Sequence, residues 1–318
     1  MQHHWTIVES VLGVFLVIAV GAVIRQLGWL HRDSDKSLAK LISNVLLPAY
    51  FLQKILFADS HQIGSEALIP PLWGFLFTSS CFVLALFFAR RFGSWIGLKS
   101  DSSKRAFALC VGICNFGFIP LPLAERYYPD AVVDLILHNV GVNLALWSVG
   151  LAVIQGTVRG GIRAAFLSPP FLSVFLAIMI QLQFGAEVVP SFMGTAIESL
   201  GACAIPLGLI LSGAIMVDFL REATWRGSVS MVLAAISLRQ VVFPALMIVL
   251  GTLLSVDRTM RQIILLQAAM PAAIFPIVIV KLYDHDLETA TRVVVASSVL
   301  GVITIPIWLT IGVGWMVN

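Results

Sequence analysis

The sequence predicts an all-α polytopic membrane protein with about ten transmembrane helices, and three observations lead to this prediction. Hydrophobic residues make up 59% of the 318 residues and the mean hydropathy is +0.96. Charged residues make up only 12%, whereas a soluble domain carries roughly 25%, so this composition cannot cover a water-exposed surface. Apolar runs of roughly the 20 residues needed for one crossing recur along the whole chain and leave no room for a soluble catalytic domain.

The expected spans are apolar runs bounded by charged residues, proline or glycine. The first run follows a segment without a basic region, so we expect a first helix rather than a cleaved signal. In chain order the spans cover residues 6–27, 38–57, 67–90, 104–124, 131–155, 167–184, 190–217, 227–254, 260–282 and 288–315.

Lysine and arginine are distributed unevenly over the connections between these spans. The odd-numbered connections carry fifteen of them and the even-numbered connections only four. Because basic residues favour the cytoplasmic side, the odd connections are expected there. The prediction is a multi-pass protein of the cell (cytoplasmic or inner) membrane with external N- and C-termini. No long basic or acidic block indicates a nucleic-acid partner, so the expected environment is the lipid bilayer.

The spans divide into two halves of five, residues 1–155 and 156–318. Because five is odd, the second half enters the membrane in the opposite orientation, as in the inverted repeats of many secondary transporters. Proline positions support this division. Pro48 in the second span and Pro206 in the seventh lie 158 positions apart.

Two further groups of prolines fall in the fourth and ninth spans, within C-N-F-G-F-I-P-L-P (114–122) and A-M-P-A-A-I-F-P (269–276). Proline lacks an N–H and clashes with the preceding helical turn. The residues expected to break the two helices are Pro120, Pro122, Pro271 and Pro276, with Gly117 beside the first pair. Corresponding interruptions in the two halves indicate a binding site near the bilayer midplane. The alternative is that these prolines only kink two helices for packing.

Amide side chains lie close to the predicted breaks. Asn115 is at the first break, and Gln267 precedes Pro271 by four residues. Asn139 and Asn143 stand one turn apart on one helix face, which we expect to look into the protein. These amides could bind a substrate carboxylate. Hydrogen bonding between helices or to freed backbone groups is the alternative.

Charged and sulfur-containing residues give weaker indications. Arg239 is expected to snorkel toward the cytoplasm or to pair structurally, with a substrate-charge role as the alternative, and Glu198 is expected at a solvated helix end. The chain also has four cysteines in apolar stretches, read as small core residues that imply no metal site or cofactor: Cys81, Cys110, Cys114 and Cys203. No phosphate-binding or hydrolase motif is present, so no enzyme is predicted.

Six segments together resemble the auxin efflux carrier family, which includes plant auxin exporters and bacterial malate or malonate permease-like proteins. The resemblance runs over nearly the whole chain, and its order and spacing make it specific. The segments are I-S-N-V-L-L-P-A (42–49), N-F-G-F-I-P-L-P-L (115–123), N-V-G-V-N-L-A-L-W-S-V-G (139–150), L-G-A-C-A-I-P-L-G-L-I-L-S-G (200–213), L-R-Q-V-V-F-P (238–244) and L-Q-A-A-M-P-A-A-I-F-P (266–276).

The resemblance implies two inverted five-helix repeats that both contribute to a scaffold domain and a transport domain. The fourth and ninth spans would cross at their breaks, as in bile-acid sodium symporters and bacterial sodium/proton antiporters. Asn115 matches the family's crossover asparagine, while Pro120 stands where bacterial members usually have glycine. Near Phe275 the sequence is closer to the plant pattern. The candidate substrate-binding residues are Asn115, Phe116, Gly117, Asn139, Asn143, Gln267 and Phe275.

The predicted function is therefore a secondary carrier of small organic anions that works by alternating access. The membrane potential or a proton or sodium gradient would drive it, and two copies would associate through the scaffold helices. An ion channel and a non-transporting membrane sensor with the same fold are the alternatives.

Overall fold

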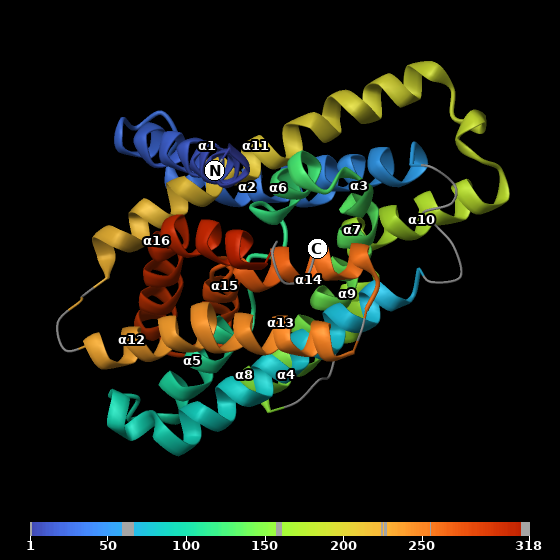
Figure 1. Cartoon of the computed structure of the whole chain (residues 1–318). Helices are drawn as coiled ribbons and strands as arrows, with labels where there is room; N and C mark the ends of the chain where they lie inside the picture. Colours follow the sequence, from blue (N-terminus) through green and yellow to red (C-terminus); the bar gives the residue numbers. More distant parts are fainter. Residues whose placement is uncertain are drawn as a thin grey trace.

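The computed structural model describes residues 2–58, 67–156, 161–223, 225, 228–254 and 256–312. Position 1 and positions 313–318, where the sequence predicts the external termini, lie outside these ranges. All regular secondary structure within the ranges is helical (Figure 1). The α-helices are α1 Gln2–Gln26, α2 Asp35–Leu41, α3 Leu47–Leu56, α4 Ile69–Phe92, α5 Asp101–Gly112, α6 Pro120–Tyr127, α7 Val132–Ala145, α8 Leu151–Gln155, α9 Gly161–Phe166, α10 Pro169–Gln183, α11 Ser191–Glu222, α12 Val229–Ser237, α13 Phe243–Leu253, α14 Arg258–Ala269, α15 Phe275–Leu282 and α16 Leu287–Gly312.

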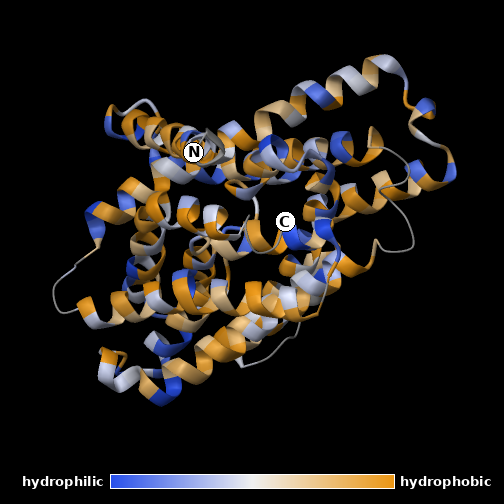
Figure 2. Cartoon of the chain, viewed as in Figure 1, coloured by the Kyte–Doolittle hydropathy of each residue, from blue (hydrophilic) through white to orange (hydrophobic). Residues whose placement is uncertain are grey.

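Six helical segments of the described chain are long and apolar enough to cross a membrane. They are Trp5–Gln26, Ile69–Ile96, Pro129–Gln155, Ser191–Glu222, Val229–Leu253 and Leu287–Gly312. The second expected span is a continuous helix from α2 through α3, and the sixth is represented by the shorter α10. Hydrophobic residues, coloured orange in Figure 2, recur along much of the length of these helices. The architecture is that of an all-helical multi-pass membrane protein, and the total of ten spans stays a prediction.

Three of these helices contain a π-helical turn: η2 Ile42–Leu46, η6 Leu146–Gly150 and η8 Leu238–Val242. Proline follows two of them closely, as Pro48 and Pro244. Because proline cannot donate to the carbonyl four residues earlier, the helix there accommodates an extra residue per turn. The helices continue through these positions.

The fourth and ninth expected spans are interrupted, which confirms the predicted breaks. The first gap separates α5 from α6 and the second separates α14 from α15. Of the four predicted break prolines, only Pro271 lies within a gap. Pro120, Pro122 and Pro276 lie in the first turns of α6 and α15, where a missing N–H costs no intrahelical hydrogen bond.

Close helix contacts are made at glycine. A Cβ added to Gly21 of α1 would lie 2.0 Å from the carbonyl oxygen of Ile210, and one added to Gly213 of α11 would lie 1.8 Å from that of Ile18. These two helices therefore pack backbone to backbone, as small residues permit in membranes. The α11 helix also packs on α3, which packs on α10, while α4 packs on α5 and α7.

The buried apolar side chains form two clusters, and the two breaks lie where the clusters meet. Cys114 belongs to one cluster and its neighbour Ile113 to the other. Met270 and Ala272 divide in the same way at the second break. The gaps therefore lie deep within the bundle rather than at one of its ends.

Polar contacts link the odd-numbered connections to one another. Arg25 forms ion pairs with Asp35 and Asp218, which joins the first expected connection to the end of α11. Arg105, after the third connection, donates to the carbonyl of Val153 at 2.8 Å. These contacts agree with a common side for the odd connections.

Candidate functional site

The two breaks are paired to each other through their backbones. The N–H of Asn115 donates to the carbonyl of Pro271 at 2.7 Å, and the N–H of Ala273 donates to the carbonyl of Ile113 at 3.1 Å. Between them Cys114 and Ala272 form an isolated antiparallel bridge. Backbone groups that left a helix deep in the bundle are thus satisfied by the other break, as a low-dielectric interior requires.

The second break is also anchored to α16 and η8. The N–H of Ala272 donates to Oγ of Ser297 at 3.2 Å. The backbone carbonyl of Ser297 accepts from Nε2 of Gln240, whose Oε1 accepts from Oγ1 of Thr304 at 2.6 Å. This chain of hydrogen bonds fixes the break relative to two other helices.

Gln267, the fully buried residue near the end of α14, holds the first break. Its Nε2 donates to Oδ1 of Asn139 at 2.9 Å and to the carbonyl of Phe116 at 3.3 Å. Its Oε1 accepts from Sγ of Cys114 at 3.1 Å. Both the nitrogen and the oxygen of the Gln267 amide are therefore hydrogen-bonded within the protein.

The side chains of Asn115 and Asn143, unlike those of Gln267 and Asn139, have no hydrogen-bond partner in the described ranges. Both side chains are half-buried, and neither makes a hydrogen bond within the described chain. The N-termini of α6 and α15 follow the two gaps, and helix N-termini carry partial positive charge and free N–H groups. Amide donors beside such termini can bind a carboxylate.

The remaining predicted site residues are only partly brought together. Phe116 and Gly117 lie in the first gap and are half-buried. The exposed fraction of Phe275 is 46%, and its ring packs against Trp147 at a centroid distance of 6.1 Å, so the ring does not lie at the paired breaks. Sequence reasoning missed Phe118, whose ring covers Gly208 of α11.

Two other sequence expectations were wrong about burial, those for Arg239 and Cys203. Arg239 does not snorkel, because its exposed fraction is only 1%. His138 lies inside α7 and is buried, and neither ring nitrogen has a hydrogen-bond partner in the described chain. Cys203, expected in the core, is exposed.

Glu198 is exposed, as expected, although it lies within α11 rather than at a helix end. No group of three or more His, Cys, Asp or Glu residues in the described ranges is placed to hold a metal ion.

Comparison with known proteins places this arrangement in a family. A family model described as membrane transport protein matches residues 6–163 and 159–309. The chain belongs to the auxin efflux carrier family. It is 25% identical to an uncharacterized transporter of Methanothermobacter thermautotrophicus over 94% of this chain and 96% of the relative.

Two further relatives cover the chain in the same way. An uncharacterized transporter of Methanocaldococcus jannaschii is 20% identical over 97% of this chain and 98% of its own. The uncharacterized transporter YfdV of Escherichia coli strain K12 is 21% identical over 95% and 96%, respectively. The similarity to transporters thus extends over whole chains.

In this member of the auxin efflux carrier family, two cavities lie at the C-terminal end of α3, at the side that the sequence predicts to be external. The first, of about 280 Å³, is lined by α3, α6 and the start of α7. The second, of about 520 Å³, lies between α3 and α11 and includes Glu198. Neither cavity is lined by Asn115.

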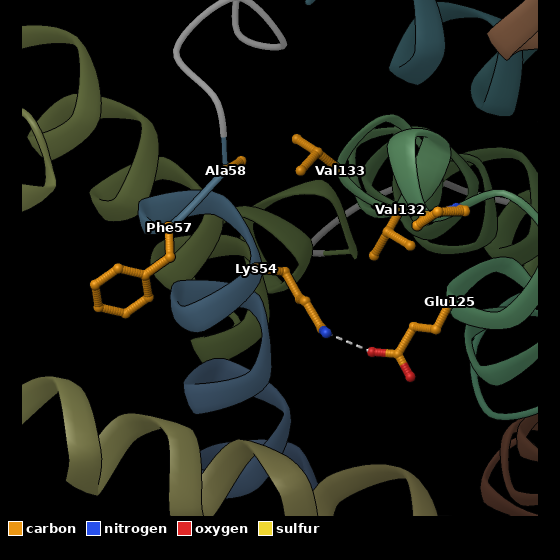
Figure 3. A pocket seen from close by; sticks show the side chains of 7 residues that line it. Lys54, Phe57, Ala58, Glu125, Val132 and Val133 are labelled. Atoms are coloured by element: carbon orange, nitrogen blue, oxygen red, sulfur yellow. Dashed lines mark ion pairs between the residues drawn. The ribbon is translucent and has the colours of Figure 1, made fainter.

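Lys54 of α3 lines both cavities and forms an ion pair with Glu125 of α6 at 2.6 Å (Figure 3). The hydroxyl of Tyr50 donates to the same carboxylate at 3.0 Å. Both contacts tie α3 directly to the half-helix that begins at the first break.

Proposed function

We propose that this protein is a secondary transporter of small organic anions, carboxylates in particular, and that it works by alternating access. The observation that carries the proposal is the pairing of two helix breaks beside Asn115, whose amide has no partner in the described chain. Two half-helix N-termini and a free amide suit a carboxylate group. Membership of a membrane transport family supports the general class.

Asn115 would donate to the carboxylate, and Asn143 of α7 would provide a second amide for the bound anion. Gln267 and Asn139, which hydrogen-bond each other, would hold the first break in place. In this proposal Phe116 and Gly117 shape the gap, and Phe275 takes no direct part because its ring packs on Trp147.

The packing suggests how access would alternate. The group formed by α1, α3, α10 and α11 would be the scaffold, and the helices around the two breaks would be the transport domain. Both inverted repeats, 1–155 and 156–318, would contribute to each domain. Movement of the transport domain would break the Lys54–Glu125 contact, and substrate would then reach the breaks from the α3 side.

Counterflow in proteoliposomes tests the proposal. Vesicles preloaded with unlabelled malonate or indole-3-acetate should accumulate the labelled compound from outside, and protein-free vesicles should not. The double variant Asn115→Ala/Asn139→Ala should lose this exchange, whereas Asn44→Ala, at an exposed position, should keep it.

Three results would contradict the proposal in different ways. Unchanged exchange by the double variant would refute the site. Binding of either carboxylate without flux would favour a sensor. Flux that does not saturate with substrate concentration would favour a channel.

A further inference from the structure

Arg239 is a buried cation held at a distorted point of its helix. It lies in the π-helical turn η8, between α12 and α13. Pro244 cannot donate to the carbonyl of Gln240 four residues earlier, and that carbonyl accepts instead from Nε1 of Trp308 at 2.7 Å. The turn that carries Arg239 is therefore fixed against α16.

No carboxylate of the described chain pairs with this cation. Its Nε and Nη2 atoms are buried and have no hydrogen-bond partner in the described ranges. The ring of Phe243 lies 5.7 Å from the guanidinium carbon and provides a cation–π contact. Arginine stays charged under all physiological conditions, and an unpaired buried charge is costly. A buried ionisable residue within a membrane domain is by default a candidate for a functional role.

The turn that carries Arg239 is linked to the paired breaks. The neighbouring Gln240 donates to the carbonyl of Ser297, whose hydroxyl accepts from the N–H of Ala272 in the second break. The turn η8 also contacts α5, whose C-terminus at Gly112 carries partial negative charge. This dipole offsets part of the positive charge, but no full negative charge in the described chain does so.

We propose that Arg239 is the fixed counter-charge that makes the paired breaks selective for anions. The inference rests on the proposed function and adds the residue that sets the sign of the substrate. Arg239 acts through the low-dielectric interior on an anion bound beside Asn115 and is not itself a ligand. The purely structural alternative is that Arg239 serves only to compensate the α5 terminus.

The selectivity for anions is measured with pairs of compounds that have similar shape but differ in charge. Each carboxylate, malonate or indole-3-acetate, is compared with its neutral amide, malonamide or indole-3-acetamide, by titration calorimetry on purified protein. At an effective dielectric constant of about 20, a unit charge about 10 Å away changes affinity roughly tenfold. The wild type should therefore prefer the carboxylate by roughly tenfold or more.

Two substitutions separate charge from shape. Arg239→Lys keeps the charge and should keep most of the preference. Arg239→Gln removes the charge and should reduce the preference roughly tenfold while leaving amide binding unchanged. The matched control is Arg91→Gln, which makes the same change in net charge at an exposed position.

The outcomes distinguish this inference from the proposed function. A folded Arg239→Gln protein with unchanged preference would overturn the inference and leave the transporter intact. If that variant does not fold, equal wild-type affinity for acid and amide would overturn the inference equally. Absence of binding and counterflow for all four probes would overturn both.

Discussion

The side-chain amide of Gln267 donates a 2.9 Å hydrogen bond to Oδ1 of Asn139, 128 residues earlier in the chain. The same nitrogen reaches the carbonyl of Phe116, so one side chain connects α14, α7 and the first break. Since Gln267 is completely buried, water cannot replace these bonds. The geometry of the first break depends on this residue.

Replacement of Gln267 by Leu should lower the apparent melting temperature, because Asn139 and Phe116 each lose a buried donor. The expected cost is about 1–3 kcal/mol. Combined with Asn139→Ala in a double-mutant cycle, the two changes should couple by about 1 kcal/mol. Gln262→Leu on the same helix is the control, because the Gln262 side chain makes no hydrogen bond in the described chain. If the stability effects of Gln267→Leu and Asn139→Ala are strictly additive, the hydrogen bond between the two side chains does not contribute to stability.

The ion pair between Lys54 and Glu125 should hold the α3 side closed. Partly exposed pairs are worth roughly 0.2–1 kcal/mol, so Lys54→Gln should shift a conformational equilibrium up to about fivefold. The measurement is the labelling rate of Val133→Cys, which lines the first cavity, by a membrane-impermeant maleimide. The exposed native thiol is removed by Cys203→Ser.

Charge reversal provides the control for this prediction. Lys54→Glu/Glu125→Lys should restore slow labelling, although the Tyr50 hydroxyl loses its carboxylate acceptor at position 125. Equal labelling rates in wild type and Lys54→Gln would show that the pair does not hold this side closed.

The breaks were predictable from sequence because their cause is local. Proline removes its own N–H wherever the chain places it, so Pro120 and Pro271 marked the two gaps. The partner of Gln267 was not predictable, since a hydrogen bond between distant helices leaves no local pattern. Burial of Arg239 was missed because its apolar span is longer than one crossing. Such a span can place the side chain either at the membrane interface or in the protein interior.

The packing of Phe275 on Trp147, away from the breaks, was missed for a related reason. A motif gives the order of residues around a break but not the helix face on which each falls. Here α15 begins at Phe275 itself, and its first turn directs that ring toward Trp147. Asn115 lies in the gap, where its backbone pairing to Pro271 fixes its position.

Acid should weaken the start of α5. A hydrogen bond from Arg105 lowers the pKa of Asp101 below its ordinary value. A carboxyl with a lowered pKa stabilises the fold above its unfolded-state pKa, about 4, and this contribution is lost as pH falls through the lowered value. The melting-temperature difference between wild type and Asp101→Asn should therefore be constant at neutral pH and shrink below about pH 4.

Arg105→Ala should cost more stability than Asp101→Asn at neutral pH. Arg105 also donates to the carbonyl of Val153 at 2.8 Å, and its side chain is far less exposed than that of Asp101. High salt should reduce the Asp101 contribution because the pair is near the surface. Equal effects of the two substitutions would show that the Val153 contact contributes nothing.

Two glycines of α11 should respond differently to the same substitution. At Gly213 an added Cβ would lie 1.8 Å from the carbonyl oxygen of Ile18, a backbone atom that can move only with α1. Gly213→Ala should therefore destabilise the protein by about 1–3 kcal/mol. At Gly208 the Cβ would meet the ring of Phe118, which can rotate away. Gly208→Ala should preserve the melting temperature but displace a side chain of the first break.

Thermal unfolding and counterflow together separate these two effects. Gly208→Ala should change exchange rate with little change in melting temperature, and Phe118→Ala in the same chain should relieve the displacement. Gly13→Ala is the control, because nothing lies within 4 Å of its added Cβ. If Gly213→Ala melts like wild type, the close approach of α1 and α11 is not required for stability. If Gly208→Ala leaves exchange unchanged, contact between α11 and the break does not limit transport.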